Sequence, residues 1–207
     1  VADFICGFDE YRRRLLTHLC DVKLGHWERA TRELAGRALA VVGKRDPEWV
    51  RSVALPALLT RALSPALEAR HGATVGAGEA LLALHGAGVP CVADMDDEDL
   101  IGAGEGEGGG GGLLASRVVE LVAAVEKARL YRGKGGEVMR AAVCRYVECL
   151  AVVRQPLDKG PGPATGPKSL RSSLLASVED SLKHPTADIR DAAVRALGEF
   201  ALAYMCK

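Results

Sequence analysis

The residues that most resemble a site for chemistry lie at 130–144, LYRGKGGEVMRAAVC, where Gly133, Gly135 and Gly136 surround Lys134 before a helical pattern. This is the layout of a phosphate-binding loop. A loop of the Walker type requires GxxxxGK followed by Ser or Thr, because backbone amides cradle the phosphate and the hydroxyl holds Mg²⁺. Here Gly135 follows the lysine, and the segment before the loop has a helical rather than an extended pattern. We therefore interpret the stretch as a glycine turn between two helices.

The other polar clusters fit no catalytic or metal-binding pattern. The acidic residues of 94–99 lack the ligand spacing and the closing glutamate of a calcium loop. The five histidines form no HExxH motif and no cluster with cysteine. We therefore expect no enzyme, no metal site and no bound cofactor. The six cysteines form no CxxC pair, and we interpret them as reduced thiols in a cytosolic protein.

The overall composition narrows the class of partner. Lys plus Arg equals Asp plus Glu at 27 each over 207 residues, so no net charge attracts the chain to nucleic acid or to an anionic membrane. No uncharged apolar run approaches the length of a membrane span, and the N-terminus lacks the order of a signal peptide. We expect neither nucleic-acid binding nor membrane insertion.

The elements that would position any site are predicted to be helices. Aromatic residues make up only 4% of the chain, and the prevalence of Ala, Leu, Val and Arg favours helix over strand. Apolar residues recur at helical spacing in eight windows: 11–22, 30–43, 47–63, 69–86, 113–131, 137–153, 169–184 and 187–204. Residues 92–112 and 156–168 are rich in glycine or in proline and glycine, and we expect them to be flexible loops.

A repeat organises these helices. Four windows align on an arginine that stands six residues after a polar residue: Arg32 after His26, Arg70 after Ser64, Arg140 after Lys134, and Arg190 after His184. These repeat arginines follow one another at 38, 70 and 50 residues. Without the two loops, the spacing is close to the period of roughly 40–47 residues of HEAT repeats. We predict an all-α fold, an α-solenoid of about four HEAT-like helical hairpins over residues 1–207, as a fragment of a longer array.

The repeat arginines have two possible roles. They could line a groove that binds an acidic surface. Alternatively, each packs its stem against the next repeat and pairs with an acid of the turn, such as Glu68 or Asp188. We favour the second interpretation. Trp27 and Trp49 are equally compatible with interface anchors and with packing between hairpins.

Three blocks of sequence resemble the C-terminal region of the tubulin-folding cofactor D family. They are HWERATRELAGRAL at 26–39, LSPALEARHGATVGAGEALLAL at 63–84, and LYRGKGGEVMRAAVC at 130–144. The blocks occur in the family's order, and the resemblance covers nearly the whole chain, while the glycine-rich and Pro/Gly loops depart from it. The third block makes the glycines around Lys134 a feature of the family rather than a phosphate site.

The resemblance implies a non-catalytic scaffold that acts in the cytoplasm, associated with the cytoskeleton. Its implied partners are β-tubulin, the other tubulin-folding cofactors and an Arf-like small GTPase. The implied role is post-chaperonin tubulin folding and assembly of the αβ heterodimer, with stimulation of GTP hydrolysis by tubulin as part of a cofactor complex. The alternatives are a HEAT scaffold for another assembly and, third, a nucleotide-binding enzyme.

Four residues form the protein-partner surface that we predict from these blocks. They are Trp27, Arg132, Lys134 and Arg140.

Overall fold

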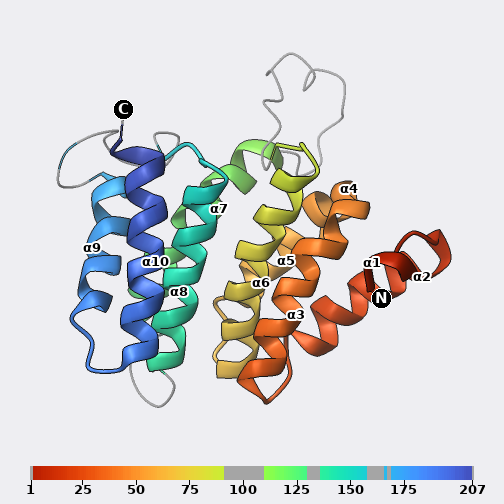
Figure 1. Cartoon of the computed structure of the whole chain (residues 1–207), viewed down its shortest axis with the longest axis horizontal. Helices are drawn as coiled ribbons and strands as arrows, with labels where there is room; N and C mark the ends of the chain where they lie inside the picture. The colour runs from red at the N-terminus through yellow and green to blue at the C-terminus, as the bar shows by residue number, and fades with distance from the viewer. Residues whose placement is uncertain (1, 91–109, 130–135, 158–165, 167–168, 207) are drawn as a thin grey trace.

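A computed structural model describes residues 2–90, 110–129, 136–157, 166 and 169–206 (Figure 1). Every regular element in these ranges is helical, as the composition predicts. In chain order they are α1 Ala2–Ile5, α2 Asp9–His18, the π-helical η1 Leu19–Lys23, α3 Arg29–Val42, the 3₁₀ turn η2 Gly43–Arg45, α4 Pro47–Trp49, the π-helical η3 Val50–Ala54, α5 Leu55–Arg61, α6 Leu67–Gly86, α7 Gly110–Lys127, α8 Gly136–Val152, α9 Leu170–Leu182 and α10 Ala187–Tyr204.

The helices form two layers. The helices that carry the repeat arginines, which we call the second helices, pack in chain order: α3 on α6, α6 on α8, and α8 on α10. They run parallel to one another in Figure 1. The first helices, α2 with η1, α4 to α5, α7 and α9, form the other layer, in which α7 contacts both α5 and α9. This is the α-solenoid of four helix pairs that the repeat predicts, with the arginine on the second helix of each pair.

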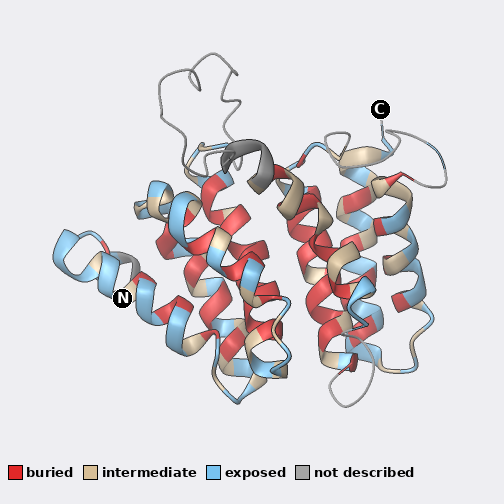
Figure 2. Ribbon diagram, turned by 180° about the vertical axis from the view of Figure 1, so that it is seen from behind, coloured by how far each residue is buried: buried red, intermediate tan, exposed pale blue. Residues whose placement is uncertain are grey.

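The core lies between the layers and follows α6 and α8 through the middle of the array (Figure 2). α6 buries 14 of its 20 residues because α3, α5 and α8 surround it. A close backbone contact on one side requires glycine. A Cβ at Gly72 would lie 1.6 Å from the carbonyl oxygen of Leu24, the residue that ends η1. The first helix pair can therefore approach α6 only over a residue without a side chain.

The helix ends show where the sequence prediction was wrong. α7 begins at Gly110, so residues 110–112 of the predicted loop are helical. The first backbone amides of a helix have no hydrogen-bond partner within it, so the first turn places few demands on the residue type. The packed apolar residues that follow stabilise the helix, which extends back to Gly110 because helix formation is cooperative. The same helix ends at Lys127, earlier than predicted, where Arg129 has a left-handed φ of 56°. Periodicity also did not predict α1 or the π-helical turns η1 and η3.

The rest of the predicted loops, residues 92–109 and most of 158–168, lies outside the described residues. The assignment of 1–207 to one region stays a prediction.

No cysteine in the described ranges forms a disulfide, and Cys6, Cys20, Cys144 and Cys149 are buried in the core as small apolar groups would be. Burial, with a smaller effect of Asp21, raises the pKa of Cys20 to about 12, so this thiol is a poor nucleophile. None of the helices in the described ranges is long and apolar enough to cross a membrane.

Candidate functional site

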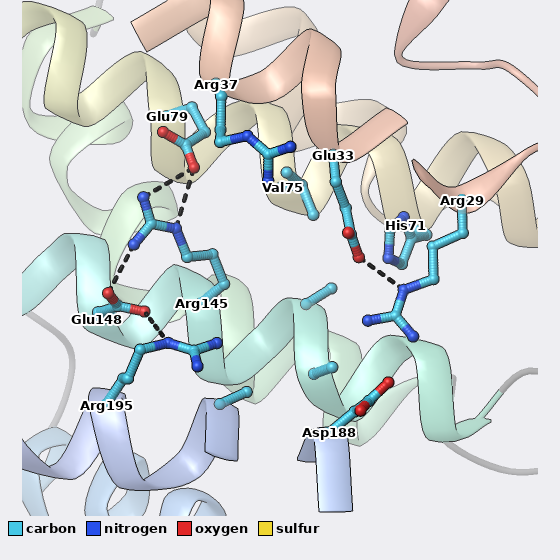
Figure 3. A pocket seen from close by; sticks show the side chains of 13 residues that line it. Arg29, Glu33, Arg37, His71, Val75, Glu79, Arg145, Glu148, Asp188 and Arg195 are labelled. Atoms are coloured by element: carbon cyan, nitrogen blue, oxygen red, sulfur yellow. Dashed lines mark hydrogen bonds and ion pairs between the residues drawn. The ribbon is translucent and has the colours of Figure 1, made fainter. Parts of the chain in front are cut away.

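A groove of about 390 Å³ crosses the four second helices on one face of the array (Figure 3). Each helix contributes one residue per turn to it, because residues three or four apart lie on the same side of a helix. Its floor consists of small apolar side chains, and charged side chains surround the floor. The lining residues are Arg29, Glu33 and Arg37 of α3; His71, Val75 and Glu79 of α6; Ala141, Ala142, Arg145 and Glu148 of α8; and Asp188, Ala192 and Arg195 of α10.

One end of the groove holds a buried ion cluster. Arg145 binds Glu79 through Nε at 3.0 Å and Nη2 at 2.9 Å, and it binds Glu148 through Nη1 at 2.6 Å. Both glutamates are buried, at 3% and 9% exposed, so the single guanidinium balances two acids that water does not solvate. Glu148 Oε2 accepts no hydrogen bond from the described residues, and Arg195 Nε lies 3.9 Å from it.

The protonation states in this cluster follow from burial and charge. Burial alone would lower the pKa of Arg145, but Cys149 in its ionised form and the carboxylates of Glu79 and Glu148 outweigh burial and raise that pKa above its ordinary value. Burial raises the pKa of the adjacent Cys149, whose thiol is therefore neutral and contributes no charge. The cluster thus contains a fixed cation between two anions, with Arg195 as a second cation at longer range.

The other end of the groove is formed by Arg29, Glu33, His71 and Asp188 (Figure 3). Arg29 Nε donates to Glu33 Oε1 at 2.6 Å within α3. His71 accepts a hydrogen bond at Nδ1 from Arg32 Nε at 3.0 Å. Burial first, and then Arg32, lowers the pKa of His71 to about 3, so the imidazole is neutral. Among the residues that line this end, the acids outnumber the bases.

The repeat arginines turn out to shape the loops that precede their helices. Arg32 Nη1 donates to the carbonyl oxygens of His26 at 2.7 Å and Trp27 at 2.9 Å. Arg190 Nη1 donates in the same way to His184 at 2.9 Å and Pro185 at 2.6 Å.

In the second repeat, Arg70 Nη1 donates to the carbonyl of Pro65 at 2.5 Å. The interpretation that the repeat arginines pair with turn acids was wrong for Arg70 and Arg190, since Glu68 and Asp188 form no ion pair with them. Unpaired backbone carbonyls of the turn are nearer acceptors than the side chains of the helix.

The polar residue six positions earlier completes each of these turns. His26 Nδ1 accepts the backbone N–H of Glu28 at 3.1 Å, and His184 Nδ1 accepts that of Thr186 at 3.2 Å. Ser64 Oγ does the same for the N–H two residues after it, at 3.2 Å. The repeat pattern is therefore explained by one turn geometry. The turn begins with a side chain that accepts a backbone N–H, and the arginine donates to the carbonyl oxygens of the turn.

The four residues predicted as a partner surface have different surroundings. Trp27 is 78% exposed on the turn before α3, and its ring contacts the protein mainly through His26, with centroids 5.4 Å apart. Arg140 Nη1 forms an ion pair with Asp180 of α9 at 2.7 Å. Arg132 and Lys134 lie outside the described residues.

The groove was not predicted from the sequence, although a signal for it was present. A second arginine follows the repeat arginine by five residues in three of the four windows, and these second arginines are Arg37, Arg145 and Arg195. All three line the groove. Their shared offset marks a shared face of the second helices.

Glu79 and Glu148 are the other missed residues. A lone acid within the apolar windows GAGEALL and YVECLAV indicates a buried charge, which needs a partner.

The two-layer array of parallel second helices is an α-solenoid, a class of fold whose continuous face can serve as a binding surface. Over 160 residues, 77% of the chain, it is 22% identical to tubulin-specific chaperone D of Dictyostelium discoideum. The match supports a distant relationship. The chain spans only 10% of the length of that relative. No family model matches the chain, and no solved structure matches it.

Proposed function

We propose that this chain is a segment of a tubulin-folding chaperone that binds its partners as a non-catalytic scaffold in the cytoplasm. The observation that carries the proposal is the match to tubulin-specific chaperone D over 77% of the chain. A solenoid of helix pairs suits this role because it offers a long continuous surface over which many contacts share the binding energy.

The proposed partners are β-tubulin, the sister cofactors and an Arf-like small GTPase. The scaffold would act in post-chaperonin folding and in assembly of the αβ heterodimer. It would stimulate GTP hydrolysis by tubulin only together with another cofactor.

Trp27 is the residue that we propose as a direct partner contact. Its neighbours in the first block of the family resemblance have structural roles: His26 and Arg32 hold the turn, and Arg32 also binds His71. The Trp27 side chain is 78% exposed. A large aromatic ring that packing does not explain is a typical hot spot of a protein interface.

The other three predicted contact residues stay proposals of lower rank. Arg140 is held by Asp180, so a partner would have to compete with that ion pair. Arg132 and Lys134 are proposed only because they share the third block with Arg140.

Capture of purified αβ-tubulin by the intact protein tests the function and the contact together. We expect the wild type to retain tubulin, and Trp27→Ala to weaken retention about tenfold, as loss of a hot-spot ring does. Phe4→Ala is the matched control because Phe4 is 74% exposed and lies outside the three blocks.

Failure of the wild type to retain tubulin or a sister cofactor would contradict the proposed function. Equal retention by Trp27→Ala and wild type would contradict only the contact. Saturable binding of GTP or ATP by this chain would favour the nucleotide-binding enzyme instead.

A further inference from the structure

The groove residues are arranged in rows across the array. In one row the acids are bound within the protein, while the arginines are exposed. Each second helix contributes one charged residue to this row at one end of the groove, in the order of the array: Arg37, Glu79, Glu148 and Arg195 (Figure 3). The two acids at its centre are buried and bound by Arg145. The two arginines at its ends are exposed.

The arginines at the ends of this row retain hydrogen-bond donors. Arg37 has no hydrogen bond and no ion pair with any residue in the described part of the chain. Arg195 has only the 3.9 Å approach of its Nε to Glu148, which leaves both Nη groups free to bind other groups. A guanidinium offers five N–H donors in a plane that matches a carboxylate, so each end of the row can bind one.

Glu148 contributes more than charge balance. Its Oε2 is buried without a hydrogen bond and faces Arg195. The attraction between them holds the Arg195 stem over the groove, so the guanidinium is oriented before a ligand arrives. Glu79 has the corresponding place in the row next to Arg37, which Figure 3 shows at the same end of the groove.

The net charge differs between the two ends of the groove. Arg37, Arg145 and Arg195 outnumber Glu79 and Glu148 at one end, which leaves one positive charge. Among the residues that line the other end, Arg29 is outnumbered by Glu33 and Asp188, but Arg32 behind the neutral His71 offsets the difference, so this end has no net positive charge.

A uniform polyanion such as nucleic acid would place part of its charge where the groove has no net positive charge to attract it. A protein segment that places carboxylates only at the positive end would not.

We propose that the groove binds an acidic segment of a protein partner, with one carboxylate on Arg37 and a second on Arg195. Adjacent packed helices are separated by about 8–10 Å, so α3 and α10 lie on the order of 25 Å apart. An extended chain spans this distance in about eight residues. The segment therefore carries two acids about eight residues apart, and the apolar floor of Val75, Ala142 and Ala192 contacts the residues between them.

Synthetic peptides test this inference without tubulin, so its outcome is separate from that of the proposed function. The probe is a peptide whose only charged side chains are two glutamates eight residues apart. A second peptide has the same composition with adjacent glutamates, and a third probe is a short DNA duplex. Binding to the intact protein is measured by fluorescence anisotropy.

We expect saturable binding of the spaced peptide, weaker binding of the adjacent-glutamate peptide, and a loss of about tenfold or more in the double variant Arg37→Glu/Arg195→Glu. The control is Arg14→Glu/Arg171→Glu, which changes the net charge equally on α2 and α9 of the other layer. Circular dichroism of both variants verifies their fold.

Three results would overturn the inference: no saturable binding of the spaced peptide, equal losses in both double variants, or tighter binding of the DNA duplex.

Discussion

The first and last contacts between second helices are built in opposite ways. At the first junction Arg32 of α3 reaches the buried His71 of α6, and the carbonyl of Leu24, which caps η1 in the same helix pair as α3, approaches Gly72 of α6 closely. α8 and α10 meet through apolar bulk, with Phe200 buried and Tyr204 reaching the end of α8. The stability of the first junction should therefore fall when a side chain is enlarged or a histidine is protonated. The stability of the last junction should fall when a buried side chain is made smaller. Each prediction below tests one side of this difference.

The largest effect is expected for Gly72→Ala. The new Cβ would lie 1.6 Å from a backbone oxygen, so α6 and the end of η1 must separate. We expect the free energy of unfolding in urea to fall by about 4 kcal/mol or more, beyond the roughly 1–3 kcal/mol that is typical of overpacking, because backbone rather than a flexible side chain must move.

Gly198→Ala is the matched control for this change. It places the same methyl group on exposed α10, where nothing lies within 4 Å, and should stabilise by about 0.5–1 kcal/mol. Equal effects at the two glycines would refute the close contact at the first junction.

Phe200→Ala tests the last junction by removal. Its ring is 1% exposed and packs against Tyr204, with centroids 4.9 Å apart. A cavity at this position should lower the free energy of unfolding by about 3 kcal/mol in the same urea titration. Val194→Ala on the exposed side of α10 should change it by no more than about 0.5 kcal/mol. A small loss for Phe200→Ala would mean that α8 and α10 do not depend on apolar bulk.

His71 gives the first junction a dependence on pH that the last junction lacks. Its pKa is about 3 in the folded chain and about 6.5 when unfolded, so the unfolded chain binds more protons between these values. Stability from the neutral imidazole is complete above pH 6.5 and falls as the pH drops toward 3. We expect a loss of about 2 kcal/mol at pH 5 relative to pH 8.

His71→Gln keeps an acceptor for Arg32 but does not titrate, so its unfolding free energy should vary less over this range. Urea titrations of both proteins at several pH values give the difference, from which the other titrating groups cancel. Parallel pH curves for the two proteins would contradict this role of His71.

The smallest effect is expected for Tyr204→Phe. The hydroxyl donates toward two carbonyls at the end of α8, those of Leu150 at 3.1 Å and Gln155 at 2.9 Å. Its removal keeps the ring and should lower the free energy of unfolding by about 1 kcal/mol. Hydrogen exchange should speed up at the C-terminal turn of α8 and stay unchanged in α3. Faster exchange throughout the array would show that the hydroxyl supports more than this turn.

Periodicity and the repeat predicted the layers because both depend on local spacing. The 3.6-residue period identifies each helix, and the arginine offset pairs the helices correctly. The turn bonds of Arg70 and Arg190 could not be predicted in detail, since turn acids and carbonyls are both within sequence reach. The groove depends on how four helices align in space, and the spacing of residues within one helix does not determine that alignment. The offset of Arg37, Arg145 and Arg195 was visible, but without the parallel packing it did not define a face.

The hydrogen bond between Arg32 and His71 constrains how these two positions can change during evolution. Each residue lies in a different helix pair, and neither keeps its hydrogen bond if the other is replaced by an apolar residue. Leu24 and Gly72 are tied in the same manner, by space rather than by a bond. Among relatives of this chain, positions 32 and 71 should therefore covary, and a side chain at position 72 should appear only together with a rearranged segment around 24. The first two repeats should therefore evolve together, because their contact surfaces must match. Recombination that exchanged one of them alone would disrupt the junction.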